Sequence, residues 1–253
     1  MHVSWIIPAY NEERRIEKTV REVDAYLRSK NFPGGYEIIV ADSASRDRTA
    51  EIVSGLSRGM QRLRLVKVEN RGKGWAVKQG MLAARGEARV FADADNSVSP
   101  EQADRFLPHL CRPEAEARGG CFDIVIGSIG VPGATVEERA QWYRRFLGRL
   151  AKFAIRAVSG LGEVRDSQRG FKFFSRRAAE AIFPRQRLTG WGFDFEILLI
   201  GKRNGFRIKE IPVRWVNPSD SKVRLHAYLT TLLELFAVKW NDLLGRYRAS
   251  PTP

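Results

Sequence analysis

The sequence predicts an α/β fold in which a mostly parallel sheet is covered by helices on both faces. Three observations predict it. Short apolar runs alternate with helical patterns through the first half of the 253-residue chain, an order typical of parallel sheets. Hydrophobic residues make up 43% of the chain and charged residues 28%, which excludes intrinsic disorder. The length suits one large α/β unit, so we expect a single domain over residues 1–253.

The elements expected in the first half follow from their periodicity. We expect strands over residues 3–7, 36–41, 63–68, 88–92 and 122–126, and helices over 14–27, 49–56, 74–84 and 100–110. Ser99 can cap the last of these helices, with Pro100 at its first position. Ligands of open α/β sheets bind beyond the carboxyl ends of the strands, so we look there for functional groups.

The second half of the chain does not continue this regular alternation of strands and helices. We expect a long helix over residues 136–159, a polar turn over 163–169, a strand over 171–174, helices over 176–183 and 193–204, a strand over 206–215 and a final helix over 225–244. The sequence has no internal repeat and no linker long enough to separate two independent domains.

Positive charge is concentrated in the second half. The chain has 43 basic and 29 acidic residues, a net charge of +14. Residues 1–130 contain 20 basic and 18 acidic residues, a net charge of +2, whereas residues 131–253 contain 23 and 11, a net charge of +12. This excess of positive charge in residues 131–253 indicates an anionic partner, which could be a nucleic acid, a phosphorylated substrate or an anionic membrane surface. Solubility alone is the simpler alternative.

Cysteine content and hydropathy limit the class of protein. Only Cys111 and Cys121 are present, which excludes a disulfide-stapled scaffold and a zinc ribbon. No apolar run approaches the ~20 residues that span a bilayer. The first residues lack the pattern of a signal peptide. We therefore expect a cytoplasmic protein.

The helix expected over residues 136–159 has the pattern of a membrane-interface helix. A broad apolar face that includes Trp142, Phe146 and Phe153 lies beside a stripe of cations. These cations are Arg145, Arg149, Lys152 and Arg156. The alternative is an amphipathic helix that packs on the core and exposes a basic edge.

Paired carboxylates indicate a metal-bound diphosphate. Asp93 and Asp95 flank Ala94 directly after the apolar run 88–92. Mg²⁺ and Mn²⁺ prefer oxygen ligands, and Mg²⁺ often takes one or two carboxylates together with phosphate oxygens. The glycine-rich loop 70–75 opens a helix, where phosphate is favoured, but it lacks the spacing of a P-loop or a dinucleotide-binding motif. A solvated turn is the alternative reading of that loop.

Seven motifs, in order, resemble those of inverting glycosyltransferases of family 2, which have the GT-A fold, and in particular their polyprenyl-phosphate branch with its dolichyl-phosphate glucose and mannose synthases. They are Pro8-Ala9-Tyr10-Asn11-Glu12, Asp42-x-x-Ser45-x-Asp47-x-Thr49, Asn70-x-Gly72-Lys73-Gly74, Asp93-x-Asp95, Asp166-Ser167-Gln168-Arg169-Gly170-Phe171-Lys172, Gly190-Trp191-Gly192-Phe193-Asp194-Phe195-Glu196 and Glu210-Ile211-Pro212-Val213-Arg214-Trp215.

The resemblance implies a role for each matching position. Residues 1–130 would form the nucleotide-sugar half, 131–224 the acceptor half with its interface helix, and 225–253 a C-terminal helix and tail. The nucleotide sugar would be held by Pro8, Tyr10, Glu12, Asp42, Lys73, Asp93, Ala94 and Asp95, with Asp93 and Asp95 also binding Mg²⁺ or Mn²⁺. Transfer would involve Asp95, Asp166, Gln168 and Arg169, and the lipid phosphate would be met by Arg145, Arg149, Lys222 and Arg224.

Three positions depart from the branch. Ser43 follows Asp42 where the branch has Asp or Asn, Ile129 replaces an Arg that helps to hold the acceptor phosphate, and Ser97 replaces a Gln frequent in mannose synthases. The last difference favours glucose over mannose.

The resemblance implies metal-dependent, inverting transfer of a hexose, with UDP-glucose favoured, to a polyprenyl or dolichyl phosphate by a peripheral enzyme on the cytoplasmic face of a membrane. A GDP-sugar or another UDP-sugar, or a soluble or polysaccharide acceptor, is the alternative. A homodimer is possible on this evidence. Nucleic-acid binding is disfavoured, because a carboxylate-lined edge repels a polyanion and no nucleic-acid-binding motif is visible.

Overall fold

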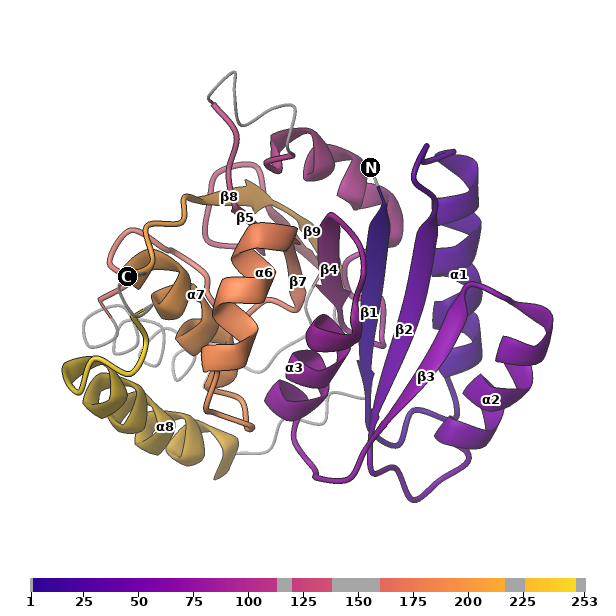
Figure 1. Ribbon diagram of the computed structural model, residues 1–253, viewed down its shortest axis with the longest axis horizontal. Coiled ribbons are helices and arrows are strands. Elements are labelled where there is room, and N and C mark those ends of the chain that lie inside the picture. The colour runs from indigo at the N-terminus through magenta and orange to yellow at the C-terminus, as the bar shows by residue number, and fades with distance from the viewer. Residues whose placement is uncertain (1, 113–119, 138–159, 217–225, 249–253) are drawn as a thin grey trace, which may run out of the picture.

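A seven-stranded sheet forms the centre of the computed structural model, which describes residues 2–112, 120–137, 160–216 and 226–248. The strand order is β3-β2-β1-β4-β7-β5-β8 (Figure 1). Only β7 runs antiparallel to its neighbours in this sheet. The strands are β1 (Val3–Ala9), β2 (Tyr36–Ser43), β3 (Leu63–Val68), β4 (Ala88–Ala92), β5 (Ile124–Ser128), β7 (Phe171–Ser175) and β8 (Ile208–Pro212).

Helices cover both faces of the sheet (Figure 1). On one face pack α1 (Ile16–Ser29), α2 (Thr49–Gly59) and two 3-10 helices, η1 (Pro100–Arg105) and η2 (Leu107–His109). On the other pack α3 (Lys73–Ala83), α6 (Arg176–Ile182), η3 (Phe183–Arg185), α7 (Phe193–Arg203) and α8 (His226–Leu243). The predicted fold class, a mostly parallel sheet between two helical layers, is therefore confirmed.

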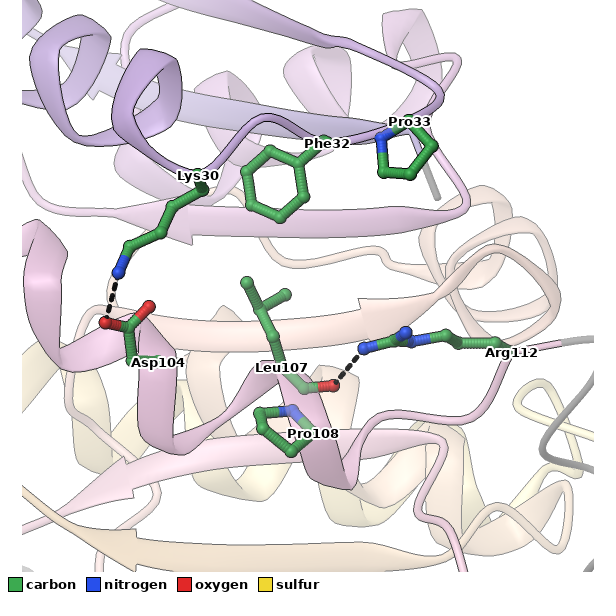
Figure 2. Close-up of a pocket in the computed structure, with 7 residues that line it drawn as sticks. All are labelled: Lys30, Phe32, Pro33, Asp104, Leu107, Pro108 and Arg112. Atoms are coloured by element: carbon green, nitrogen blue, oxygen red, sulfur yellow. Dashed lines mark hydrogen bonds and ion pairs between the residues drawn. The ribbon is translucent and has the colours of Figure 1, made fainter.

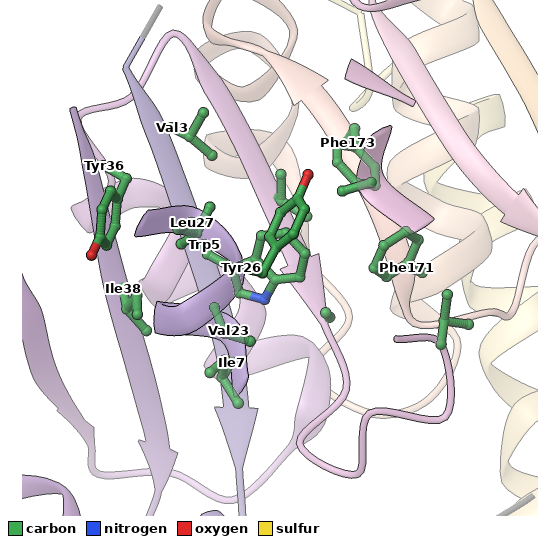
Figure 3. Packing of buried hydrophobic residues seen from close by; sticks show 14 of the residues in the cluster. Val3, Trp5, Ile7, Val23, Tyr26, Leu27, Tyr36, Ile38, Phe171 and Phe173 are labelled. Carbon is green, nitrogen blue, oxygen red and sulfur yellow. The ribbon is translucent and has the colours of Figure 1, made fainter. Parts of the chain in front are cut away.

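Aromatic packing fixes β7 against the first half of the chain. The ring centroid of Trp5 on β1 lies 6.0 Å from that of Tyr26 on α1, 5.9 Å from Phe171 and 6.4 Å from Phe173, each in an edge-on arrangement (Figure 3). Edge-on aromatic pairs contribute about 0.5–1.5 kcal/mol beyond the area they bury. The loop that precedes β7 is thereby held at one end of β4, which matters for the site below.

Two of the expected elements differ from the structure. The α-helix expected over 100–110 is two 3-10 helices, since Pro108 lacks an amide hydrogen and interrupts an α-helix. Ser99 makes no side-chain cap, although Pro100 does occupy the first turn. The strand expected over 206–215 ends at Pro212, and a separate strand, β9 (Arg214–Val216), pairs with β6 (Thr135–Glu137).

The prediction of an interface helix over 136–159 is wrong for its first two residues, because Val136 and Glu137 belong to β6. Its remaining residues, 138–159, lie outside the described residues. The other expected helices and strands are present with ends shifted by a few residues. Within the described ranges, no helix is both long and apolar enough to cross a membrane.

A single disulfide joins the two cysteines. Cys111 follows η2 and Cys121 precedes β5, with their Cα atoms 4.8 Å apart. The sequence excluded a scaffold stapled by several disulfides but did not indicate this bond. It links residues ten positions apart in the sequence, close to the start of β5.

Candidate active site

Five loops that carry described site residues meet at one edge of the sheet, and one of them is the glycine-rich loop that follows β3 and ends at Lys73. The other four loops come from two kinds of strand end. Three follow the carboxyl ends of the parallel strands β1, β2 and β4, where Ala9 pairs with Asp42 in register. The fourth, residues 166–170, precedes β7. Because β7 is antiparallel to β4, its first residue, Phe171, pairs with Ala92 at the end of β4. A loop distant in sequence is thus brought beside the Asp-Ala-Asp motif.

The loops after β1 and β2 are joined by backbone-to-side-chain hydrogen bonds that run in both directions. Asn11 N–H donates to Ser45 Oγ at 2.9 Å, and Glu12 N–H donates to Thr49 Oγ1 at 2.8 Å. Glu13 N–H donates to an Asp47 carboxylate oxygen at 3.1 Å. One role of the polar residues in these two motifs is therefore to hold the two loops together. Glu12 also pairs with Arg15.

Left-handed backbone conformations tighten these loops. Asn11, Ala44 and Asn96 have φ angles of 53°, 54° and 48°, and they lie after β1, β2 and β4 respectively. Such conformations cost a non-glycine residue about 1–3 kcal/mol and concentrate at functional sites. The strain therefore supports a binding role for this edge of the sheet.

Asp42 provides an unsatisfied acceptor. The residue is only 4% exposed, and one carboxylate oxygen accepts from Ser45 N–H at 3.3 Å. Its Oδ1 is buried and has no hydrogen-bond partner in the part of the chain that the structure describes. A buried acceptor without a partner costs about 1–3 kcal/mol, so this atom is suited to a ligand's N–H group. Beside it, the Arg71 guanidinium lies 4.4 Å from the ring centroid of Tyr10.

Ser43, which stands where the branch has Asp or Asn, ties β2 to the glycine-rich loop. Its hydroxyl accepts from Gly72 N–H at 2.9 Å and lies 3.0 Å from the carbonyl oxygen of Asn70. Gly72 has a φ of 145°, and a side chain there would overlap the carbonyl oxygen of Thr189. Gly72 is thus required by the close approach of two loops as well as by its backbone conformation.

Lys73 and Asp93 form an ion pair at the centre of the edge. Lys73 Nζ lies 2.7 Å from Asp93 Oδ1. Burial disfavours the charged ammonium, but the carboxylates of Asp93, Asp194 and Asp95 outweigh that effect and raise the pKa of Lys73. Lys73 therefore stays charged at neutral pH and can neutralise an anionic group.

The two carboxylates of the Asp-Ala-Asp motif are held differently. Asp93 N–H donates to the carbonyl oxygen of Gly170 at 3.0 Å, and a Cβ at Gly170 would overlap the Asp93 carboxylate. Asp95 accepts from both the N–H and the hydroxyl of Ser97, at 2.9 and 2.6 Å. Between them, the buried Ala94 accepts from Thr19 Oγ1 at 2.6 Å, which fixes the motif to α1.

A second ion pair lies directly beneath this motif, and sequence reasoning assigned it no role. Lys172 on β7 is fully buried and pairs with Asp194 on α7, while its ammonium also donates to the carbonyl oxygen of Arg169 at 2.6 Å. Burial lowers the pKa of Lys172 and raises that of Asp194. Lys172 and Asp194 lie in the motifs over 166–172 and 190–196 that resemble those of family 2 glycosyltransferases. That resemblance is the only feature of the sequence that indicates a role for them.

The loop over 187–192 connects this edge to α8. Glu234 on α8 accepts from Gly192 N–H at 2.6 Å. Glu196 on α7 accepts from the N–H groups of Arg187 and Leu188 and from the hydroxyl of Tyr247. Burial raises the pKa of both Glu234 and Glu196. The motif over 190–196 is therefore mainly a device that fixes this loop beside Lys73.

The predicted acceptor residues of the loop before β7 form a cluster. The Asp166 side chain is fully buried, and it accepts from Ile129 N–H and pairs with Arg169, both at 3.2 Å. The Arg169 guanidinium lies 4.5 Å from the ring centroid of Trp215. Gln168 N–H lies 3.4 Å from an Asp166 carboxylate oxygen. Asp166 thus orients Arg169, the more exposed of the two.

The structure does not describe every residue predicted for the site. Arg145, Arg149, Lys222 and Arg224 lie outside the described residues. In the described part of the chain, no three His, Cys, Asp or Glu side chains gather as a metal site would require. Asp93 and Asp95 alone would leave most of the coordination of a hard cation to a bound diphosphate and water.

A pocket of about 320 Å³ lies elsewhere, at the amino ends of the strands. It is lined by Lys30, Phe32, Pro33, Asp104, Leu107, Pro108 and Arg112 (Figure 2). Lys30 and Asp104 form an ion pair of 2.6 Å across it. Residues 30–33 precede β2, so this pocket is at the opposite edge of the sheet from Asp42 and Asp93. It contains none of the predicted site residues.

Comparison with known proteins identifies the family. The family model for Glycosyl transferase family 2 matches residues 4–183. The chain belongs to glycosyltransferase family 2. The match covers the four strand-end motifs and the loop before β7, so the enzyme class predicted from those motifs, a glycosyltransferase, is confirmed.

This glycosyltransferase is similar to curated relatives over most of its length. Dolichyl-phosphate beta-glucosyltransferase ALG5C of Trichomonas vaginalis is 34% identical, over 94% of this chain and 71% of the relative. Dolichyl-phosphate beta-glucosyltransferase of Drosophila melanogaster is 33% identical, over 98% of this chain and 77% of the relative. The predicted resemblance to this branch is confirmed.

Solved structures agree with the fold. Glucosyl-3-phosphoglycerate synthase from Mycobacterium tuberculosis, in complex with Mn²⁺, UDP-glucose and phosphoglyceric acid, is similar with a TM-score of 0.62 and 20% sequence identity. The similarity covers 99% of this chain and 81% of that one. The glycosyltransferase therefore has the GT-A fold that its motifs predicted.

Proposed function

We propose that this glycosyltransferase transfers glucose from UDP-glucose to a polyprenyl or dolichyl phosphate, with inversion at the anomeric carbon. The observation that carries the proposal is the placement of Asp93 and Asp95 at the same edge of the sheet as the unsatisfied Oδ1 of Asp42. The carboxylates of Asp93 and Asp95 suit a metal-bound diphosphate, and the Asp42 oxygen suits the N–H group of a nucleotide base. The names of the curated relatives support glucose and dolichyl phosphate.

The residues at this edge fit a divalent cation bound together with a diphosphate. The available donors, Asp93 and Asp95, are carboxylates, which suit Mg²⁺ and Mn²⁺. When bound, the cation would neutralise the charge that develops on the departing nucleoside diphosphate. Lys73 adds a second positive charge next to Asp93, and the Asp42 oxygen would orient the base. The Mn²⁺ and UDP-glucose in the similar solved structure support this assignment.

The acceptor needs little activation in this scheme. A phosphate monoester is anionic at neutral pH, so it can attack without a strong general base, and catalysis depends mainly on in-line positioning. Arg169 is suited to meet an anionic acceptor, because Asp166 and Trp215 hold its guanidinium. The next residue, Gly170, accepts from Asp93 N–H and so links this loop to the Asp-Ala-Asp motif. Arg169 would thus supply the charge that Ile129, in place of the branch's Arg, does not.

An exposed apolar stripe on α8 supports a membrane-bound acceptor. Leu233, Phe236, Trp240 and Leu243 are each 63–69% exposed, and their spacing places them on one side of the helix. The opposite side packs on the core through buried Leu235 and Val238. The exposed Arg246 and Arg248 follow the stripe. We assign the stripe to an anionic bilayer surface, where aromatic rings and cations are favoured together.

The position of α8 relates this surface to the site. Glu234, one residue after Leu233, accepts from Gly192 N–H. The neighbouring Trp191 ring lies 5.4 Å from Lys73 Nζ, which in turn contacts Asp93. A bilayer on the stripe would thus lie close to the donor site. For residues 138–159 the predicted interface helix stays a prediction, and so does a homodimer.

The cytoplasmic location also stays a prediction. Disulfides are uncommon in the reducing cytosol, so the Cys111–Cys121 bond favours a different compartment. Counting free thiols in protein purified with and without a reductant would show whether the bond forms in the cell.

Binding calorimetry tests the donor proposal directly. UDP-glucose should bind in the presence of Mn²⁺ or Mg²⁺, and EDTA should weaken it at least tenfold, because two carboxylates without a cation repel a diphosphate. GDP-mannose should bind more weakly than UDP-glucose. Equal binding of UDP-glucose with and without EDTA would contradict the metal assignment, and tighter binding of GDP-mannose would contradict the donor.

A further inference from the structure

Lys73 is placed where it competes with a cation for Asp93. It is the first residue of α3, and its ammonium nitrogen lies 2.7 Å from Asp93 Oδ1. The side chains are 17% and 32% exposed, so the pair is screened only in part by solvent. A divalent cation on the same carboxylate would meet this positive charge at short range, which disfavours both charges together.

Asp93 has little room to escape from Lys73. Gly170 lies directly against the carboxylate, where a Cβ would overlap both oxygens, and the Asp93 N–H is bonded to the Gly170 carbonyl. The ammonium of Lys172, which is also nearby, is buried and paired with Asp194. Lys172 is therefore fixed, and Lys73 is the cation that can exchange.

Lys73 has an alternative direction in which to move. Its ammonium lies 5.4 Å from the ring centroid of Trp191, which is 38% exposed at the surface of the site. A diphosphate bound beside Asp93 and Asp95 would offer the ammonium new acceptor oxygens and would supply the remaining ligands of the cation. The ion pair would then be replaced rather than lost.

We propose that Lys73 is an exchangeable counter-ion of Asp93, which leaves the carboxylate when a nucleoside diphosphate arrives and so makes the divalent cation and the donor bind together. This inference rests on the proposed function, because it takes a nucleoside diphosphate as the ligand. The exchange forms and breaks only ionic contacts. Its signature is a coupling between Mn²⁺ and UDP that depends on the charge of residue 73, and linkage requires this coupling to be reciprocal.

The test is a titration of Mn²⁺ followed by its electron paramagnetic resonance signal, with and without UDP. Lys73→Met should bind Mn²⁺ alone roughly tenfold more tightly than the wild type, because it removes a positive charge from the carboxylate. UDP raises the affinity for Mn²⁺ by some factor in each protein, and this factor should be roughly tenfold smaller in Lys73→Met than in the wild type. Lys73→Arg, which keeps the charge, should resemble the wild type.

Lys18→Met is the matched control, since it removes the charge of a lysine that is 80% exposed on α1, and it should bind Mn²⁺ as the wild type does. If Lys73→Met and the wild type bind Mn²⁺ equally, with the same gain from UDP, the ion pair is only structural and the inference is wrong while the proposed function stands. If UDP gives the wild type no gain in Mn²⁺ affinity, the inference and the metal assignment are both wrong.

Discussion

Gly170 lies so close to Asp93 that any side chain at position 170 would overlap the Asp93 carboxylate. The loop before β7 and the end of β4 are therefore matched to each other, although 77 residues separate these two positions. The contact couples the loop over 166–170 to the Asp-Ala-Asp motif. A single methyl group added at Gly170 can therefore be used to test the position of the Asp93 carboxylate.

Gly170→Ala should displace the Asp93 carboxylate and weaken the binding of UDP with Mn²⁺ by tenfold or more. The overlapping atoms belong to the end of a partly exposed side chain, so stability should fall by only about 1 kcal/mol. Gly55→Ala on α2, where nothing lies within 4 Å of an added Cβ, is the control. Calorimetry and thermal unfolding measure the two effects, and unchanged UDP affinity in Gly170→Ala would contradict the expectation.

Asp42→Asn should weaken UDP binding without unfolding the protein. The buried Oδ1 has no hydrogen-bond partner among the described residues, and an amide would present an N–H group where the base needs an acceptor. We expect a loss of about 1–3 kcal/mol in binding free energy, measured by calorimetry with UDP and Mn²⁺. Asp104→Asn at the opposite edge of the sheet is the control, and equal affinities of the two variants would count against a role in base recognition.

Lys172→Met should destabilise the fold, since it leaves Asp194 buried without its partner. Breaking such a pair costs about 3–5 kcal/mol. Lys172→Met/Asp194→Leu removes both charges and should recover most of that loss. Denaturant unfolding of the single and double variants measures the difference. A single variant as stable as the wild type would show that Asp194 finds another partner or is protonated.

Phe236→Ala/Trp240→Ala should release the enzyme from anionic vesicles. Burial of a large apolar side chain contributes about 1.5–3 kcal/mol, so loss of two rings should reduce binding by at least tenfold even when each is partly inserted. Co-sedimentation with vesicles of phosphatidylcholine and phosphatidylglycerol measures this. Leu82→Ala, at a 44% exposed leucine on α3, is the control. Undiminished sedimentation of the double variant would show that the α8 stripe does not bind the enzyme to the bilayer.

Local pattern was sufficient to predict the sheet and the edge at which the candidate site residues gather. The strands over 63–68 and 88–92 were predicted with the bounds that the structure shows, because compact apolar runs ended by polar residues have few other interpretations. Motif spacing also brought Asp42, Lys73, Asp93 and Arg169 into one prediction. The structure places them at one edge of the sheet.

Contacts between distant residues could not be predicted from pattern alone. The Lys172–Asp194 pair joins a strand to a helix 22 residues away, and its carboxylate gives no local signal that it is buried. The role of Gly170 depends on an antiparallel strand inserted between β4 and β5. The break at Pro108 was readable from the sequence but was outweighed by the helical pattern around it.

The most direct test is transfer of radiolabelled glucose from UDP-glucose to dolichyl phosphate in detergent, with Mn²⁺ or Mg²⁺, extraction of the product into organic solvent, and the same assay with Asp95→Ala. The account predicts a lipid-linked β-glucosyl phosphate from the wild-type protein, none after EDTA treatment, and at least a hundredfold less from Asp95→Ala, a loss of about 2.7 kcal/mol or more in transition-state stabilisation. Wild-type protein that binds UDP-glucose with Mn²⁺ but transfers glucose only to a soluble phosphate such as phosphoglycerate would contradict it.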